Sequence, residues 1–123
     1  MVVNESAEDY LETILILSRK LPVVRAVDIA NELGYKKSSV SIAMKHLREK
    51  ERITVTDAGY IYLTDDGKAI AEKTYERHEF FTRWLETLGV DASIANEDAC
   101  KIEHVVSVES FNAIKDYVEN HNK

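Results

Sequence analysis

The chain has 123 residues, of which 45% are hydrophobic, and it carries a formal net charge of −6. That length and apolar content can bury a core in one domain or two small ones, which excludes an intrinsically disordered chain. No apolar run approaches the roughly 18 residues of a membrane span, and the segment from Met1 to Tyr10 is acidic where a signal peptide would be basic. We therefore expect a cytoplasmic protein without membrane association, and the single cysteine excludes an internal disulfide.

The charge is unevenly distributed along the chain. The segment from Arg25 to Arg52 holds seven basic and four acidic residues, a net charge of +3, which leaves −9 for the remainder. A locally basic patch can bind phosphates even in an acidic protein. This segment is therefore a candidate nucleic-acid interface, and the acidic remainder is a candidate cation-binding part.

Two short helices follow a first, largely apolar helix from Ser6 to about residue 19, which ends before Pro22. The first of the two spans residues 26–33 and ends at Gly34, the residue type that most easily adopts a left-handed cap. The second runs to about residue 50, with Ser38 or Ser39 expected as its N-cap. The two short helices form a helix-turn-helix pattern.

A β-hairpin is predicted next. Residues 53–56 and 60–63 are rich in β-branched and aromatic side chains, and Asp57-Ala58-Gly59 lies between them. A helix-turn-helix followed by such a hairpin is a winged helix.

The second half of the chain predicts three more helices. Thr64 is placed to cap a long helix from Asp65 to about Leu88, and residues 93–106 and 109–120 follow as further helices. The expected fold class is mostly α, with an N-terminal winged helix-turn-helix domain at 1–70 and a C-terminal helical domain at 71–123.

The start of the second short helix is rich in hydroxyl and cationic side chains. Hydroxyls and a helix N-terminus can bond phosphates, and lysines can contact phosphates or guanine edges. An ordinary solvated face is the alternative for each residue taken alone. The predicted DNA-binding residues are Lys36, Lys37, Ser38, Ser39, Ser41, Lys45 and Arg48.

The stretch Cys100-Lys101-Ile102-Glu103-His104 places a thiol, a carboxylate and an imidazole within about one turn of a predicted helix. With Ser107 they fall on one polar stripe. Cys100 alone is more often a structural thiol, and His104 an ordinary hydrogen-bonded histidine. Together they predict half of a metal site.

Three other residues are candidates to complete that site. Asp9 and Glu12 are three apart on the first helix, on the side of Ile16, although Ser6-x-x-Asp9 also resembles a capping box. His78 lies on the long helix, where a lone histidine is usually a core residue with one hydrogen bond.

The chain resembles the diphtheria toxin repressor and manganese transport regulator family of metal-dependent transcriptional repressors. The resemblance covers essentially the whole chain, and its most specific stretch runs from Glu97 to Val105. Its other matching stretches are Glu8-Asp9-Tyr10-Leu11-Glu12, Asp28-Ile29-Ala30, Ser39-Val40-Ser41, Leu63-Thr64 with Gly67, and Arg77-His78.

The resemblance implies a C-terminal metal-binding and dimerisation domain and a regulatory metal site. The ligands that it implies are Asp9, Glu12, His78, Cys100, Glu103 and His104. Manganese-selective members typically have glutamate in place of Cys100, and iron-dependent members have methionine in place of Asp9. Because a thiolate prefers softer ions, we expect iron(II) first and manganese(II) second, with zinc(II), cobalt(II) or nickel(II) possible in vitro.

Further expectations follow from the resemblance. The ancillary-site positions of iron-type relatives fall at Thr82 and Asn96, which are weak ligands, and we expect a two-domain member without an SH3-like third domain. The metal would act as corepressor of a homodimer that binds a double-stranded operator with palindromic half-sites, in control of metal-homeostasis genes. Some of the following apolar residues are expected at the dimer interface and some in the internal core: Phe80, Phe81, Trp84, Phe111, Ile114 and Val118.

Two other classes of function remain open from the residues alone. A metal hydrolase would need an open coordination position and a general base, and the sequence offers no substrate-pocket signature, so we do not expect an enzyme. A winged-helix regulator that senses redox state through Cys100 is the stronger alternative.

Overall fold

The computed structural model describes residues 5–121, and these residues divide between two compact units. Unit 1 comprises residues 1–73 and unit 2 residues 74–123. The boundary falls inside helix α4 (Asp65–Thr87), three residues beyond the boundary expected from the sequence. Helix α4 contributes to both units, and each unit has its own core.

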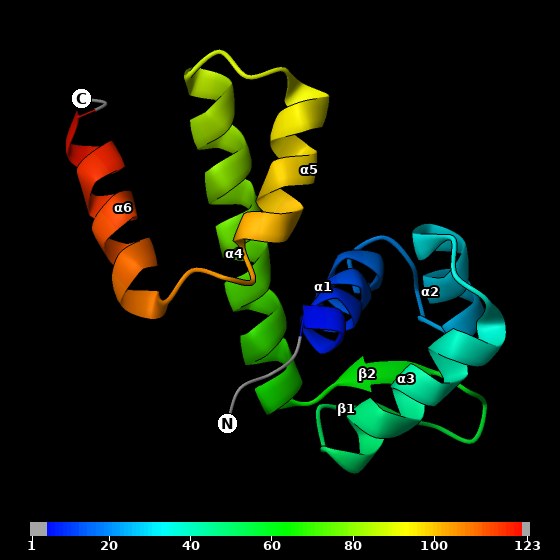
Figure 1. Ribbon diagram of the computed structural model, residues 1–123. Helices are drawn as coiled ribbons and strands as arrows, with labels where there is room; N and C mark the ends of the chain where they lie inside the picture. The colour runs from blue at the N-terminus through cyan, green and yellow to red at the C-terminus, as the bar shows by residue number, and fades with distance from the viewer. Residues whose placement is uncertain (1–4, 122–123) are drawn as a thin grey trace. The chain divides into compact units, whose positions relative to one another are not determined.

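Unit 1 is a winged helix-turn-helix, as predicted. It contains α1 (Glu5–Ser18), α2 (Ala26–Leu33), α3 (Lys37–Glu49), and the antiparallel strands β1 (Ile53–Val55) and β2 (Ile61–Leu63). Helix α1 contacts α2, α3 and β2, and the hairpin lies beside α3 (Figure 1). The core is mainly aliphatic, with buried side chains from every one of these elements, including Leu11, Ile14, Ile29, Val40, Ile53 and Ile61.

The C-cap of α2 is Gly34, as expected. The N-cap of α3, however, is neither of the two expected serines. Gly34 has φ +70° and its N–H donates to the Ala30 carbonyl. The N-cap of α3 is Lys36, which has extended backbone and no capping side chain, so Ser38 and Ser39 lie inside the first turn. The extended conformation of Lys36 lets its carbonyl accept from Val40 N–H, and the helix therefore begins before either serine.

Thr64 caps α4 as predicted and also ties that helix to the segment that follows α3. Its Oγ1 accepts the Gly67 N–H at 3.1 Å and donates to the Glu51 carbonyl at 2.7 Å. Gly67 is required here for close approach, because a Cβ at this position would overlap the carbonyl oxygen of Arg52.

Unit 2 contains the remainder of α4 with α5 (Ala92–Ile102) and α6 (Val108–His121), and α5 runs beside α4 (Figure 1). Its core joins Phe81 of α4, Ala99 of α5 and Phe111 of α6. Phe80 and Trp84 are partly buried against this core. Of the six apolar residues considered for the dimer interface, Phe81 and Phe111 are therefore the internal-core members.

The C-terminal helices differ from their predicted bounds. The helix expected at 93–106 ends at Ile102, so Glu103 is its C-cap and His104 lies in the following turn. Ser107 does not share a helical stripe with Cys100. It precedes α6, where its Oγ accepts the Ser110 N–H at 3.0 Å.

Among residues 5–121, no helix combines the length and the apolar composition that crossing a membrane requires.

Candidate functional site

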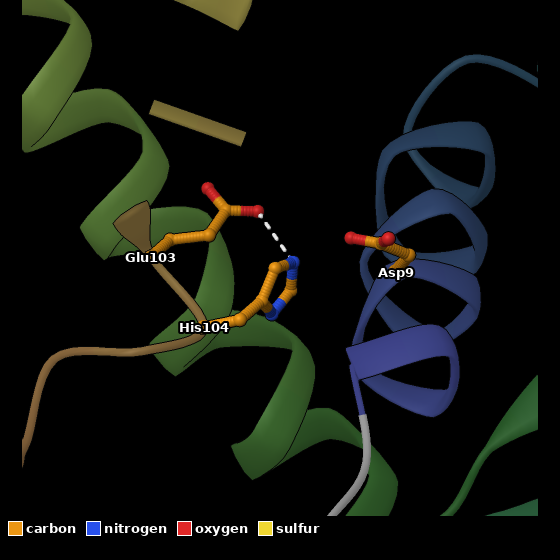
Figure 2. Close-up of side chains that lie close together, drawn as sticks. All are labelled: Asp9, Glu103 and His104. Atoms are coloured by element: carbon orange, nitrogen blue, oxygen red, sulfur yellow. Dashed lines mark ion pairs between the residues drawn. The ribbon is translucent and has the colours of Figure 1, made fainter. Parts of the chain in front are cut away.

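Four titratable side chains converge within unit 2. His78 Nδ1 lies 2.9 Å from Glu103 Oε2 and 3.7 Å from Cys100 Sγ, and His104 Nε2 lies 3.3 Å from Glu103 Oε1. Figure 2 shows the pairing of Glu103 with His104. Imidazoles from α4 and from the turn after α5 thus meet at the Glu103 carboxylate, and the thiol from α5 lies beside the imidazole of His78.

Glu103 is the central member of this cluster. Its side chain is fully buried, and each of its two carboxylate oxygens faces an imidazole nitrogen. A buried carboxylate is unfavourable unless it is paired with hydrogen-bond donors or a cation. The two imidazoles, or a metal ion bound with them, can provide that pairing.

Arg77 fixes the backbone that carries Glu103 and His104. Its Nη1 donates to the Glu103 carbonyl at 3.1 Å and to the Val106 carbonyl at 2.6 Å, and its guanidinium lies over the Phe111 ring. These two carbonyls belong to the turn that ends α5. The contact explains why the helix stops at Ile102, because an arginine from α4 provides the hydrogen bonds that further helical turns would otherwise make.

Asn96 orients the His78 ring. Its Oδ1 lies 2.9 Å from His78 Nε2, on the opposite side of the ring from Glu103 and Cys100. A proton on Nε2 satisfies this hydrogen bond and leaves the Nδ1 lone pair directed at the cluster. An outer hydrogen bond of this kind selects the tautomer of a metal-binding histidine.

The two positions considered for an ancillary site are engaged in other contacts. Thr82 Oγ1 donates to the carbonyl of His78 at 2.8 Å, one turn earlier in α4, and Asn96 bonds the His78 ring. Neither side chain adds a strong ligand.

Asp9 and Glu12 belong to unit 1, on α1, where both are partly buried (Figure 2 shows Asp9 on this helix). Because α1 already includes Glu5, Ser6 lies inside the helix and is not its N-cap, so the capping-box interpretation of Asp9 is wrong. The spacing of three residues places both carboxylates on one face of α1.

Tyr10, beside Asp9, connects α1 to the turn of the helix-turn-helix. Its ring packs edge-on against Tyr35, with centroids 6.1 Å apart. Burial raises the pKa of the Tyr10 hydroxyl above its usual value, and the neighbouring Tyr35 raises it further. Tyr10 therefore stays neutral and acts as a packing contact near neutral pH.

The donor set of the unit 2 cluster fits a divalent first-row transition metal. Imidazole nitrogen, carboxylate oxygen and thiolate sulfur are the ligand types that such ions take from proteins, and the ligands bind in deprotonated form. Asn96 and Arg77 act as the outer contacts that orient such ligands.

The seven predicted DNA-binding residues all have exposed side chains in unit 1. Sequence reasoning missed the roles of two residues, Arg77 and Asn96, that the structure makes prominent. Arg77 entered only as part of a family match, and Asn96 only as a weak ligand. Their roles depend on contacts 26, 29 and 18 residues away, which no local pattern reveals.

Two family models match the chain in succession. The N-terminal DNA-binding domain of iron-dependent repressors matches residues 3–58, and the metal-binding and dimerisation domain of the same repressors matches residues 64–123.

Individual relatives agree with these matches. The transcriptional regulator MntR of Escherichia coli O6:H1 is 33% identical over 118 residues, which cover 96% of this chain and 76% of that protein. The manganese regulator SloR is 25% identical with a TM-score of 0.82, covering 97% of this chain and 55% of that one. A manganese-dependent transcriptional repressor solved with manganese is 24% identical with a TM-score of 0.82, covering 92% of this chain and 52% of that one, and it supports the fold.

The chain spans about half the length of these two solved relatives. Across its own length, however, it matches a DNA-binding domain followed by a metal-binding and dimerisation domain. The chain therefore belongs to the diphtheria toxin repressor and manganese transport regulator family of metal-dependent transcriptional repressors, whose members are regulators and not enzymes.

Proposed function

We propose that this protein is a homodimeric repressor whose binding to a palindromic operator is activated by a divalent metal, and that it controls metal-homeostasis genes. The observation that carries the proposal is the convergence of His78 and His104 on the buried carboxylate of Glu103, with the Cys100 thiol beside the His78 ring. That cluster lies in the part of the chain that matches a metal-binding domain.

In this proposal, Asp9 and Glu12 of unit 1 complete the ligand set that unit 2 begins. A bound dication supplies the positive charge that offsets repulsion among the carboxylates. Ligation restrains α1, and α1 contacts both helices of the helix-turn-helix within unit 1. The edge-on contact between Tyr10 and Tyr35 extends that restraint to the turn before α3. The ligands therefore favour one arrangement of the recognition helix over others.

The DNA-binding face consists of the exposed residues at the start and along the outer side of α3. The hydroxyls of Ser38, Ser39 and Ser41 bond phosphates or base edges, while Lys45 and Arg48 support the grip on the backbone. Lys36 and Lys37 add charge where the helix begins. Two copies of this face are needed to occupy two half-sites, and Phe80, Trp84, Ile114 and Val118 are the proposed dimer contacts.

The ligand types and the relatives point to different ions. SloR is named as a manganese regulator, and another relative was solved with manganese, which supports manganese(II). Cys100 supports iron(II), because a thiolate favours the softer ion and iron(II) lies above manganese(II) in the general affinity order. We propose that both ions activate the protein and that Cys100 raises its preference for iron(II).

Fluorescence anisotropy on DNA from the protein's own promoter tests the function. Anaerobic titration with iron(II), manganese(II), zinc(II) and cobalt(II) should tighten binding at least tenfold over a chelator-treated sample, and His104→Ala should lose most of this gain. Metal-independent affinity would contradict the proposal. Cys100→Glu should shift the preference toward manganese(II), with Cys100→Ser as the control that removes the thiol without adding a carboxylate.

The exposure of the Cys100 thiol favours a second candidate function, that of a DNA-binding regulator that responds to oxidation. Under this alternative, peroxide would abolish operator binding by the wild type, and neither chelator nor added metal would affect it. Cys100→Ser would then bind the operator constitutively.

A further inference from the structure

One side chain on the outer face of α3 differs in kind from its neighbours. Ile42 is 58% exposed, although it lies in the middle of an amphipathic helix. The buried face of α3 consists of Val40, Met44 and Leu47. Ile42 is two residues from both Val40 and Met44, about 200° around the helix, so it points directly away from the core.

The residues around Ile42 on that face are polar. Ser38 lies one turn before it and Lys45 one turn after it, and both are exposed. Within α3, all of which the structure describes, Ile42 is the one large hydrophobic side chain that is exposed. A branched aliphatic group also has a lower helix propensity than alanine or lysine, so helix stability alone does not favour isoleucine at this site.

The DNA major groove offers a single apolar feature to such a side chain. Base edges there present hydrogen-bond donors and acceptors, and the C5-methyl group of thymine is the exception. Residues in the N-terminal half of a recognition helix reach base edges, and Ile42 is in that half of α3. The serines and lysines on this face form hydrogen bonds or contact phosphates, and these contacts do not detect a methyl group.

We infer that Ile42 is a specificity-determining residue that reads a thymine methyl group in each half-site of the operator. This inference rests on the proposed function and adds to it the chemical feature that the recognition helix selects. Removing the methyl group from that thymine removes the apolar contact without changing any Watson–Crick hydrogen bond. Uracil differs from thymine by this methyl group and is therefore the sharpest probe.

The experiment begins with selection of a tight-binding duplex from a random DNA library, using the manganese-loaded wild-type protein. Each thymine of the selected duplex is then replaced by uracil in both half-sites, and affinities are compared for wild type and Ile42→Ala. Burying one methyl group accounts for about a fourfold change in affinity. Replacing the contacted thymine by uracil in both half-sites should therefore weaken binding of the wild type by about fifteenfold. Ile42→Ala should show no more than a twofold response at that position.

Lys45→Ala is the matched control on the same face of the helix. It should weaken binding to all sequences and reduce the salt dependence, yet retain the full response to uracil. Alanine is a strong helix former at an exposed position, so Ile42→Ala should keep the helical circular dichroism of the wild type.

Two results would overturn the inference while leaving the proposed function intact. One is metal-dependent selection of a duplex at which no thymine responds to uracil, and the other is a uracil response that persists in Ile42→Ala. Failure to select any duplex with metal would overturn the proposed function and this inference together.

Discussion

The two units of this chain are stabilised in different ways. Unit 1 is closed mainly by aliphatic side chains from five elements. Unit 2 has a small aromatic core, and it buries the charged side chains of Arg77 and Glu103. Since a buried charge is unfavourable without partners, unit 2 depends on specific polar contacts where unit 1 depends on packing. Rigid packing suits a DNA-reading scaffold, and a cluster of buried polar groups suits a cation-responsive one.

The largest effect is expected from overpacking unit 1. Gly67→Ala would force a Cβ into the Arg52 carbonyl. Because backbone atoms cannot move aside as a flexible side chain can, we predict a loss of about 3 kcal/mol in the free energy of unfolding. Urea unfolding followed by circular dichroism measures it. Gly34→Ala is the control, because its Cβ meets open space and only the positive φ is unfavourable, which costs about 1 kcal/mol. Equal losses for the two variants would show that packing at Gly67 is not tight.

A polar contact in unit 2 should matter for metal binding as well as for folding. Arg77→Met keeps the apolar stem but removes the donor to the Glu103 and Val106 carbonyls, which loosens the turn that carries two proposed ligands. We predict about 10-fold to 100-fold weaker manganese(II) binding, measured by the paramagnetic resonance signal of the free ion. Arg83→Met, at an exposed position of α4, should bind as wild type does. Unchanged affinity in a folded Arg77→Met protein would refute the positioning role.

A smaller effect is expected from the outer contact to His78. Asn96→Ala removes the acceptor for Nε2–H, so the ring loses its fixed tautomer and orientation. We predict about tenfold weaker manganese(II) binding in the same assay, with little change in thermal stability. Asn112→Ala on the exposed side of α6 controls for the loss of an amide. If both variants bind equally well, the ring is oriented by other contacts.

The smallest predicted effect concerns the cap of α5. Asp91 accepts hydrogen bonds from the hydroxyl and the backbone N–H of Ser93, and these bonds hold the pKa of Asp91 below its ordinary value of 3.8. A lowered pKa means that the charged form stabilises the fold above pH 3.8, and that this contribution disappears as the pH falls through the lowered pKa. Asp91→Asn keeps the cap without the charge. Its Tm should be about 2 °C below wild type at pH 7, with the difference vanishing near pH 2.

Asp98→Asn on the exposed side of α5 is the control for the loss of a carboxylate. A Tm difference between wild type and Asp91→Asn that is the same at both pH values would show that the charge of Asp91 contributes nothing.

The contrast between the units also explains which features could be predicted from the sequence. The winged helix follows from local signals, such as Gly34 after the second helix and the hairpin pattern around Asp57-Ala58-Gly59, because packing there agrees with local preference. The end of α5 could not be predicted in this way. The apolar pattern from Ser93 to Val106 is helical, but Arg77, far away in sequence, binds the carbonyls after Ile102.

The candidate ligands could be named from the sequence, but their arrangement could not. A single helical stripe was expected to bring Cys100, Glu103 and His104 together, whereas the structure brings them together through a turn. Ser38 and Ser39 were correctly expected on the surface, although neither of them is the N-cap of α3. Tertiary hydrogen bonds account for both differences.

The most direct test of metal-activated DNA binding measures how much operator DNA increases the affinity of the protein for the metal. Thermodynamic linkage requires that operator DNA tighten metal binding by the same factor by which metal tightens operator binding. Anaerobic titration calorimetry of manganese(II) binding, with and without saturating operator, measures that factor. We predict at least tenfold tighter manganese(II) binding on the operator, equal to the factor found by anisotropy. Identical manganese(II) affinities with and without DNA would contradict metal-activated repression.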